Sequence, residues 1–105
     1  MSRLDTLLTM LEKDPTDSFL RYALAKEYEQ AGDISRAIEI LEHLKSDDPR
    51  YVGLYYHLGK MYESEGNNSQ AILIYEEGIR IAKAIPDFHA LSELNNVKVN
   101  LEMQE

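Results

Sequence analysis

The chain has 105 residues and a formal net charge of −8, with 11 Lys and Arg against 19 Asp and Glu. This length suits one domain with a modest core, and the acidic balance argues against nucleic acid as a partner, because phosphates require a basic face. The chain contains no cysteine, which excludes disulfides, thiolate metal sites and a cysteine nucleophile. No apolar run approaches the roughly 20 residues that span a bilayer, and the N-terminus lacks the continuous apolar centre of a secretory signal. We therefore expect a cytoplasmic location and no association with membranes.

The first predicted helix lies in residues 1–14. Ser2 followed by Asp5 is a pattern that can cap a helix N-terminus. Leu7 precedes Leu41 by the same interval that separates Gly32 from Gly66, and we call this interval one repeat length. The segment therefore resembles the second helix of a two-helix unit whose first helix is missing.

Residues 15–48 are predicted to form two helices joined by a short turn. Gly32 can adopt the left-handed conformation that ends a helix, and Asp33 can cap the next one. Apolar residues recur at helical spacing before the turn and after it: Leu20, Leu24, Tyr28 and Ala31, then Ala37, Leu41 and Leu44.

Residues 49–85 repeat this arrangement. Gly66 takes the place of Gly32, and laying the first unit over the second pairs identical residues at 13 of 34 positions. Asn67 takes the capping place after the glycine. Because Pro86 falls three residues late for the repeat, the second helix of this unit is expected to run about one turn longer.

Residues 86–105 are predicted to form a C-terminal capping helix. Its apolar residues are expected to pack on the preceding unit, and its asparagines suit a solvated face. The apolar set is Phe88, Leu91, Leu94 and Leu101. All segments together, residues 1–105, are predicted to form a single domain.

The repeated unit resembles the tetratricopeptide repeat, whose pattern is Trp, two residues, Leu-Gly, two residues, Tyr, then Ala, three residues, Phe, and Pro. The second unit matches at Tyr55, Leu58-Gly59, Tyr62, Ala71 and Tyr75. The first matches at Leu24-Ala25, Tyr28, Ala37, Leu41 and Pro49, but has Arg21 where a large aromatic residue is usual. The resemblance implies an all-α helical repeat fold, an α-solenoid of about six antiparallel helices.

No pattern in the sequence indicates catalysis. The histidines, His43, His57 and His89, are not spaced as zinc ligands, and adjacent acidic residues on a helix do not face a common substrate. The five glycines are scattered and form no phosphate-binding loop. We therefore expect no enzyme, no metal site and no cofactor, and interpret His57 as a groove-lining or partly buried imidazole.

The resemblance implies surface recognition, because the first helix of each unit lines a concave groove that commonly accepts a peptide. We interpret the chain as a non-enzymatic adaptor or scaffold that binds a peptide segment of a partner protein there. Its repeated lysines would attract an acidic segment, and its tyrosines would supply apolar contact. The candidate residues, selected by helical spacing, are Phe19, Tyr22, Lys26, Glu29, Tyr56, His57, Lys60 and Glu63.

Two alternatives remain at this point. Lys26 and Lys60 can instead be solubilising lysines paired with Glu29 and Glu63, three residues further along the same helix face. The chain can also be a self-associating subunit or a piece of a larger assembly, because Leu73 lies off the packed stripe of its helix.

Overall fold

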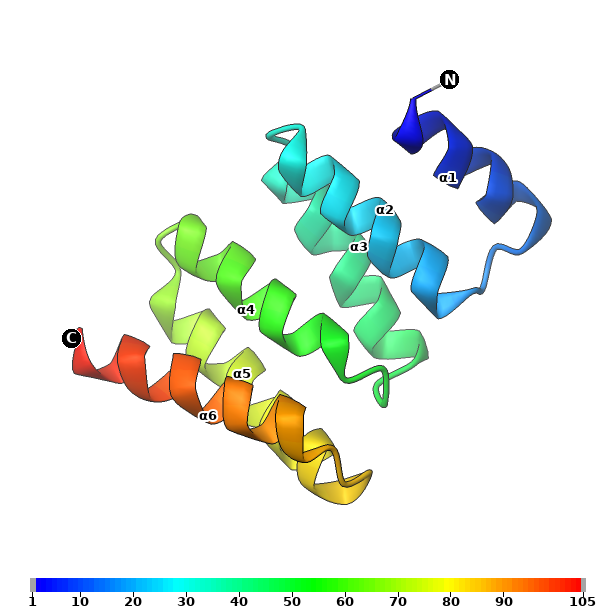
Figure 1. Ribbon diagram of the computed structural model, residues 1–105. Coiled ribbons are helices and arrows are strands. Elements are labelled where there is room, and N and C mark those ends of the chain that lie inside the picture. The colour runs from blue at the N-terminus through cyan, green and yellow to red at the C-terminus, as the bar shows by residue number, and fades with distance from the viewer. Residues whose placement is uncertain (1, 105) are drawn as a thin grey trace. The chain divides into compact units, whose positions relative to one another are not determined.

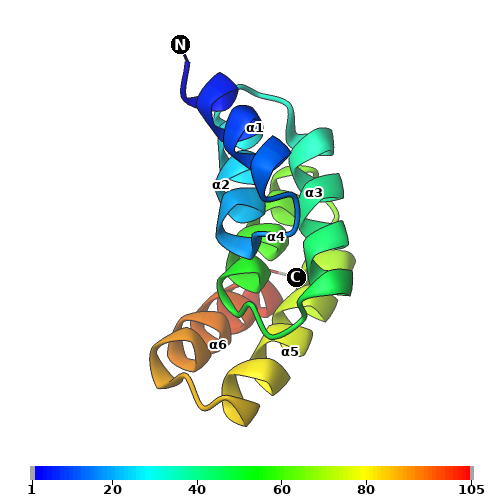
Figure 2. The same cartoon turned by 90° about the vertical axis from the view of Figure 1, so that its right-hand side faces the viewer.

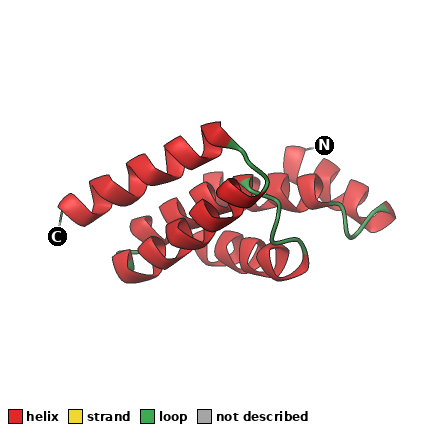
Figure 3. Ribbon diagram, turned by 90° about the horizontal axis from the view of Figure 1, so that it is seen from below, coloured by secondary structure: helices red, strands yellow, loops and turns green. Residues whose placement is uncertain are grey.

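The structure, a computed structural model, describes residues 2–104. This part of the chain forms six helices and no strand (Figures 1 and 3), which confirms the predicted all-α helical repeat fold. No helix in it is both long enough and apolar enough to span a bilayer. The helices are α1 (Arg3–Lys13), α2 (Ser18–Gln30), α3 (Ile34–Asp47), α4 (Gly53–Ser64), α5 (Asn68–Ala84) and α6 (Phe88–Met103).

The chain divides into two compact units, Met1–Asp48 and Pro49–Glu105, each containing three helices. Successive helices within a unit run antiparallel (Figure 1). The boundary between the units falls where the second repeat was expected to begin. The grouping of residues 1–105 into a single domain stays a prediction.

The first unit buries its core around α2, which contacts both α1 and α3 (Figure 2). Ala25 of α2 and Ala37 of α3 have no exposed surface, as expected for small residues where two helices approach closely. Leu7 of α1 is buried with two residues of α2, and partly buried side chains surround them. This cluster contains Leu7, Ala23 and Leu24, with Leu4, Leu11, Leu20, Tyr28 and Ile40 packed against it.

In the second unit, two buried tyrosines pack reciprocally over glycines of the facing helix. A Cβ built on Gly59 of α4 would lie 2.1 Å from Cε1 of Tyr75 on α5. A Cβ on Gly78 of α5 would lie 2.5 Å from Cβ of Tyr55 on α4. The Tyr55 hydroxyl donates to the carbonyl of Pro49. Each tyrosine side chain therefore occupies space that any larger residue at the glycine would require.

The turns between paired helices have the expected geometry. Gly32 and Gly66 have positive φ angles of +87° and +77°, a region that disfavours residues with a Cβ. The side chain of Asp33 accepts a hydrogen bond from the backbone three residues later, and Asn67 does the same. α5 has 17 residues against 14 in α3, which confirms the predicted longer helix.

Phe88 does not join the packed side of α6, and that expectation was wrong. Its side chain is 73% exposed, whereas Leu94 and Leu101 are buried. Six residues separate Phe88 from Leu94, a rotation of about 120° on a helix, so the two side chains leave the helix on different sides. An apolar residue at a helix start stays exposed when its angular position faces away from the packed side of the helix.

Candidate functional site

A cavity of about 400 Å³ lies in the first unit, between the start of α1 and one side of α2. We call it the α1–α2 cavity. Three of the eight predicted site residues, all on α2, line it. The full lining is Arg3, Phe19, Tyr22, Ala23, Lys26, Glu27 and Gln30.

The predicted residues in this cavity form an aromatic and cationic wall. The Phe19 side chain is 59% exposed, which is unusual for phenylalanine, so the core of the unit makes little use of this ring. The ammonium of Lys26 lies 5.7 Å from the centroid of the Tyr22 ring, within the range of a cation–π contact. This contact places the Lys26 ammonium beside Tyr22, and its pairing with Glu29, the alternative considered for this lysine, stays a prediction.

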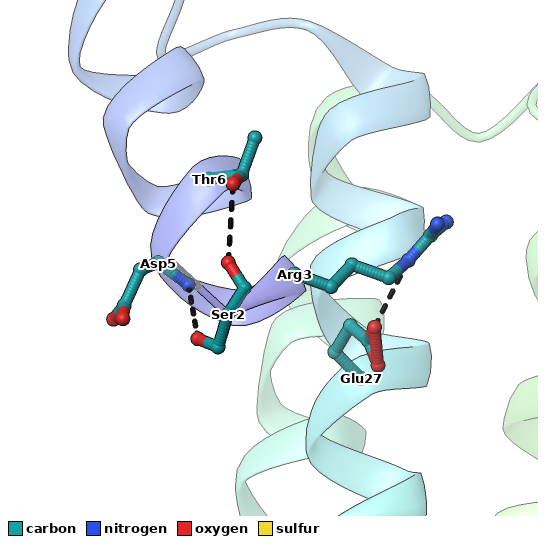
Figure 4. A network of polar contacts seen from close by, with 5 residues as sticks. All are labelled: Ser2, Arg3, Asp5, Thr6 and Glu27. Atoms are coloured by element: carbon teal, nitrogen blue, oxygen red, sulfur yellow. Dashed lines mark hydrogen bonds and ion pairs between the residues drawn. The ribbon is translucent and has the colours of Figure 1, made fainter.

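The opposite side of the cavity comes from α1 and was missed by sequence reasoning. Nε of Arg3 lies 2.9 Å from Oε1 of Glu27 on α2 (Figure 4). The start of α1 is fixed beside this pair, because Ser2 Oγ accepts from the Asp5 amide at 3.0 Å and the Ser2 carbonyl accepts from the Thr6 hydroxyl at 3.1 Å. Arg3 lies one repeat length before Ala37, the small buried residue of α3 described above. This shared repeat position is the sequence signal that places Arg3 on the side of α1 that faces α2.

The charges in the cavity differ in sign from those of the chain as a whole. Arg3 and Lys26 are cationic and only Glu27 is anionic, in a protein of formal net charge −8. Ala23 is buried and supplies an apolar floor between them. The arrangement suits a ligand that carries a negative charge next to an apolar group.

The remaining predicted residues on α4 are engaged mainly with one another. The rings of Tyr56 and His57 meet edge to face, with centroids 5.3 Å apart. Lys60 Nζ lies 3.8 Å from Glu63 Oε1, so the local pairing considered for this lysine is confirmed. These residues contribute contacts within the second unit, whereas the predicted peptide groove across both repeats stays a prediction.

Glu63 has a further structural role. Its second carboxylate oxygen accepts a hydrogen bond from the hydroxyl of Tyr75 on α5. Burial, reinforced by the hydrogen bond to Glu63, raises the pKa of Tyr75 well above its ordinary value. Because the phenol needs this acceptor in a buried position, Glu63 is better placed to hold α4 against α5 than to contact a partner.

The described residues of the site carry groups that suit recognition of another molecule. Within residues 2–104 no three His, Asp or Glu side chains are placed together as metal ligands. The described lining of the α1–α2 cavity contains no histidine, serine, threonine or cysteine. What it offers is exposed aromatic surface, two cations and one ion pair.

Comparisons with known proteins agree with the repeat pattern. The family model described as tetratricopeptide repeat matches residues 20–50 and 52–85. A crystal structure of a tetratricopeptide repeat domain protein from Salinibacter ruber is 44% identical, covers 85% of this chain and 99% of that chain, and has a TM-score of 0.81. A solution structure from the same organism, also 44% identical, covers 87% and 92%, with a TM-score of 0.84.

A protein of Bordetella parapertussis shares the fold at 24% identity, with a TM-score of 0.86 over 99% of this chain and 90% of that one. No curated protein matches the chain. Repeats of the matched family generally mediate protein–protein interaction and are typically non-catalytic. With both repeats matched over more than half of its length, the chain belongs to the tetratricopeptide repeat family.

Proposed function

We propose that this protein is an adaptor that binds an acidic, partly apolar peptide segment of another protein in the α1–α2 cavity. The observation that carries the proposal is the cavity itself, which places exposed Phe19 and the Lys26–Tyr22 pair opposite Arg3. An acidic side chain of the peptide lies between the two cations, and an apolar neighbour packs on the aromatic wall. Tyr56 and Lys60 of α4 are proposed as a separate contact region within the second unit.

The aromatic and cationic residues contribute differently to binding. Exposed ion pairs contribute about 0–1 kcal/mol each and weaken as salt increases. Aromatic side chains that become buried in an interface are the usual positions of large losses on alanine substitution, about 2 kcal/mol or more. We therefore expect Phe19 and Tyr22 to determine most of the affinity, and Lys26 and Arg3 most of its salt dependence.

The proposal is tested with short fluorescent synthetic peptides. One peptide alternates Glu with Leu and Phe, and its matched control carries Lys in place of every Glu. Lys26→Glu should weaken binding of the acidic peptide by about tenfold at low salt, with little change at high salt. Tyr22→Ala should weaken it under both conditions. Lys83→Glu, the same charge change at an exposed lysine of α5, serves as the control and should leave binding unchanged.

Specific results would contradict this assignment. If the acidic peptide binds no better than the basic one, the charge argument fails. If Lys26→Glu and Tyr22→Ala retain full helicity and full affinity, the peptide does not occupy the α1–α2 cavity. In that case the exposed side chain of Leu73 on α5 marks the next region to examine.

Self-association is a second candidate function, favoured by the exposed apolar residues of α6. Phe88 and Met103 are 73% and 79% exposed. Together with Val99 they fall within about 60° of one another around the helix, so they form one stripe. Sedimentation velocity across a wide concentration range tests this candidate, with Phe88→Ser as the variant expected to remove any association.

A further inference from the structure

A second hollow lies in the first unit, where the end of α1 meets α2 and α3. Its volume is about 280 Å³, and it shares no lining residue with the α1–α2 cavity. We call it the Pro15 hollow. Leu11, Leu24 and Ile40 supply its apolar walls, and Pro15, Arg21, Glu39 and His43 complete the lining. None of the eight residues selected from the sequence lies in it.

The internal repeat indicates what the Pro15 hollow lacks. Arg21 and Pro15 stand one repeat length before Tyr55 and Pro49. In the second unit the Tyr55 side chain is buried, and its hydroxyl donates to the Pro49 carbonyl. The aromatic ring of Tyr55 thus fills the space between the α4 backbone and Pro49. In the first unit both equivalent positions line an open hollow instead.

The side chain that replaces the tyrosine is held in a fixed direction. Nη2 of Arg21 lies 2.9 Å from Oδ2 of Asp47 at the end of α3, and the arginine side chain is only 16% exposed. A guanidinium group immobilised by a carboxylate presents a flat cationic face, which stacks favourably on an aromatic ring. Arg21 therefore borders the hollow with a surface that prefers aromatic over aliphatic groups.

We propose that the Pro15 hollow binds an aromatic side chain, preferably tyrosine, from a partner protein. The ring lies between Leu24 and Ile40 and stacks against Arg21, and the phenol hydroxyl donates to the Pro15 carbonyl as Tyr55 does to Pro49. Its size is sufficient, because a cavity of about 150 Å³ lined by aliphatic and aromatic residues already holds benzene. The partner's ring thereby takes the place of the aromatic residue that the first repeat lacks at position 21.

The probe for this site is p-cresol, which is the tyrosine side chain as a free molecule. Methyl resonances of Leu24 and Ile40 are followed by NMR during titration of the full chain. Saturable shifts are expected at these methyls and none at Leu101 of the second unit. 4-Methylcyclohexanol, which has a similar outline and a hydroxyl but no aromatic ring, should bind at least threefold more weakly because it cannot stack on Arg21.

Variants at one position provide the decisive comparison. Arg21→Tyr should abolish p-cresol binding by filling the hollow with the chain's own ring, and Arg21→Leu should weaken it at least threefold by removing the stacking face. Arg80→Tyr, the same substitution at an exposed arginine of α5, should have no effect. The proposal is overturned if wild-type protein shows no saturable shift at Leu24 or Ile40, or if p-cresol affinity is unchanged in both Arg21 variants.

Discussion

Gly59→Ala should destabilise the second unit, although alanine is the better helix former. In a helix interior the exchange of glycine for alanine normally gains about 1 kcal/mol. Here the new methyl group would lie 2.1 Å from Cε1 of Tyr75, with two more ring carbons 2.6 Å away. Overpacking of this kind costs about 1–3 kcal/mol, and three short contacts place it in the upper part of that range. The free energy of unfolding should therefore fall by about 1–2 kcal/mol.

The assay is urea denaturation followed by circular dichroism at 222 nm. Gly53→Ala is the matched control, because a Cβ there would meet only Tyr51 at 3.9 Å, an ordinary contact. It should leave the midpoint unchanged or raise it slightly. If Gly59→Ala is as stable as the control, the Tyr75 ring can move without cost and the close-packing argument is refuted.

A double variant tests whether the ring itself causes the loss. The first unit has Ala25 and Leu41 at the positions of Gly59 and Tyr75. Gly59→Ala combined with Tyr75→Leu reproduces that pair, so it should be about 1–2 kcal/mol more stable than the sum of the two single changes predicts. Strict additivity would show that the two residues are not coupled.

Four further outcomes follow from the structure. Gly66→Val should cost about 1 kcal/mol or more, because a β-branched residue is poorly tolerated at a φ of +77°, and the urea midpoint measures it. Deleting residues 87–105 should expose the apolar side of α5 and lower the melting temperature or cause aggregation. Arg21→Tyr should raise the melting temperature by filling the Pro15 hollow. The pKa of Tyr75 is raised on folding, so its contribution to stability is complete below the unfolded value of about 10 and is lost as pH rises above it. Tyr75→Phe should therefore show a smaller alkaline loss of stability than the wild type.

The helices, their turns and their caps could be predicted because local chemistry determines them. Gly66 has the positive φ that the repeat of glycines suggested, and Asn67 caps the next helix within three residues. The bond from Tyr75 to Glu63 joins side chains on different helices. No periodicity in one helix contains that information, so helical spacing predicts Glu63 as a binding residue and cannot predict its contact with Tyr75.

The candidate site was predicted only in part on α2 and was missed on α1, for a related reason. Helical spacing selects Phe19, Tyr22 and Lys26 because it describes one face of one helix. Arg3 and Glu27 belong to the cavity only through the packing of a second helix against that face. Their contribution depends on the tertiary arrangement of the two helices. The shared repeat position of Arg3 and Ala37 indicates that arrangement only indirectly.

The two repeats retain their fold while differing at the surface, and paired changes explain how. Tyr55 packs on Gly78 in the second unit, and the equivalent pair in the first unit is Arg21 and Leu44. Leu44 restores volume at the glycine position and is fully buried, so the helices of the first unit still pack. Arg21 does not restore the ring, because its cation is drawn to the carboxylate of Asp47. Leu44 thus maintains the core of the first unit, whereas Arg21 leaves the Pro15 hollow open. Because packing tolerates this pair of residues, the first repeat has a proposed recognition surface that the second repeat lacks.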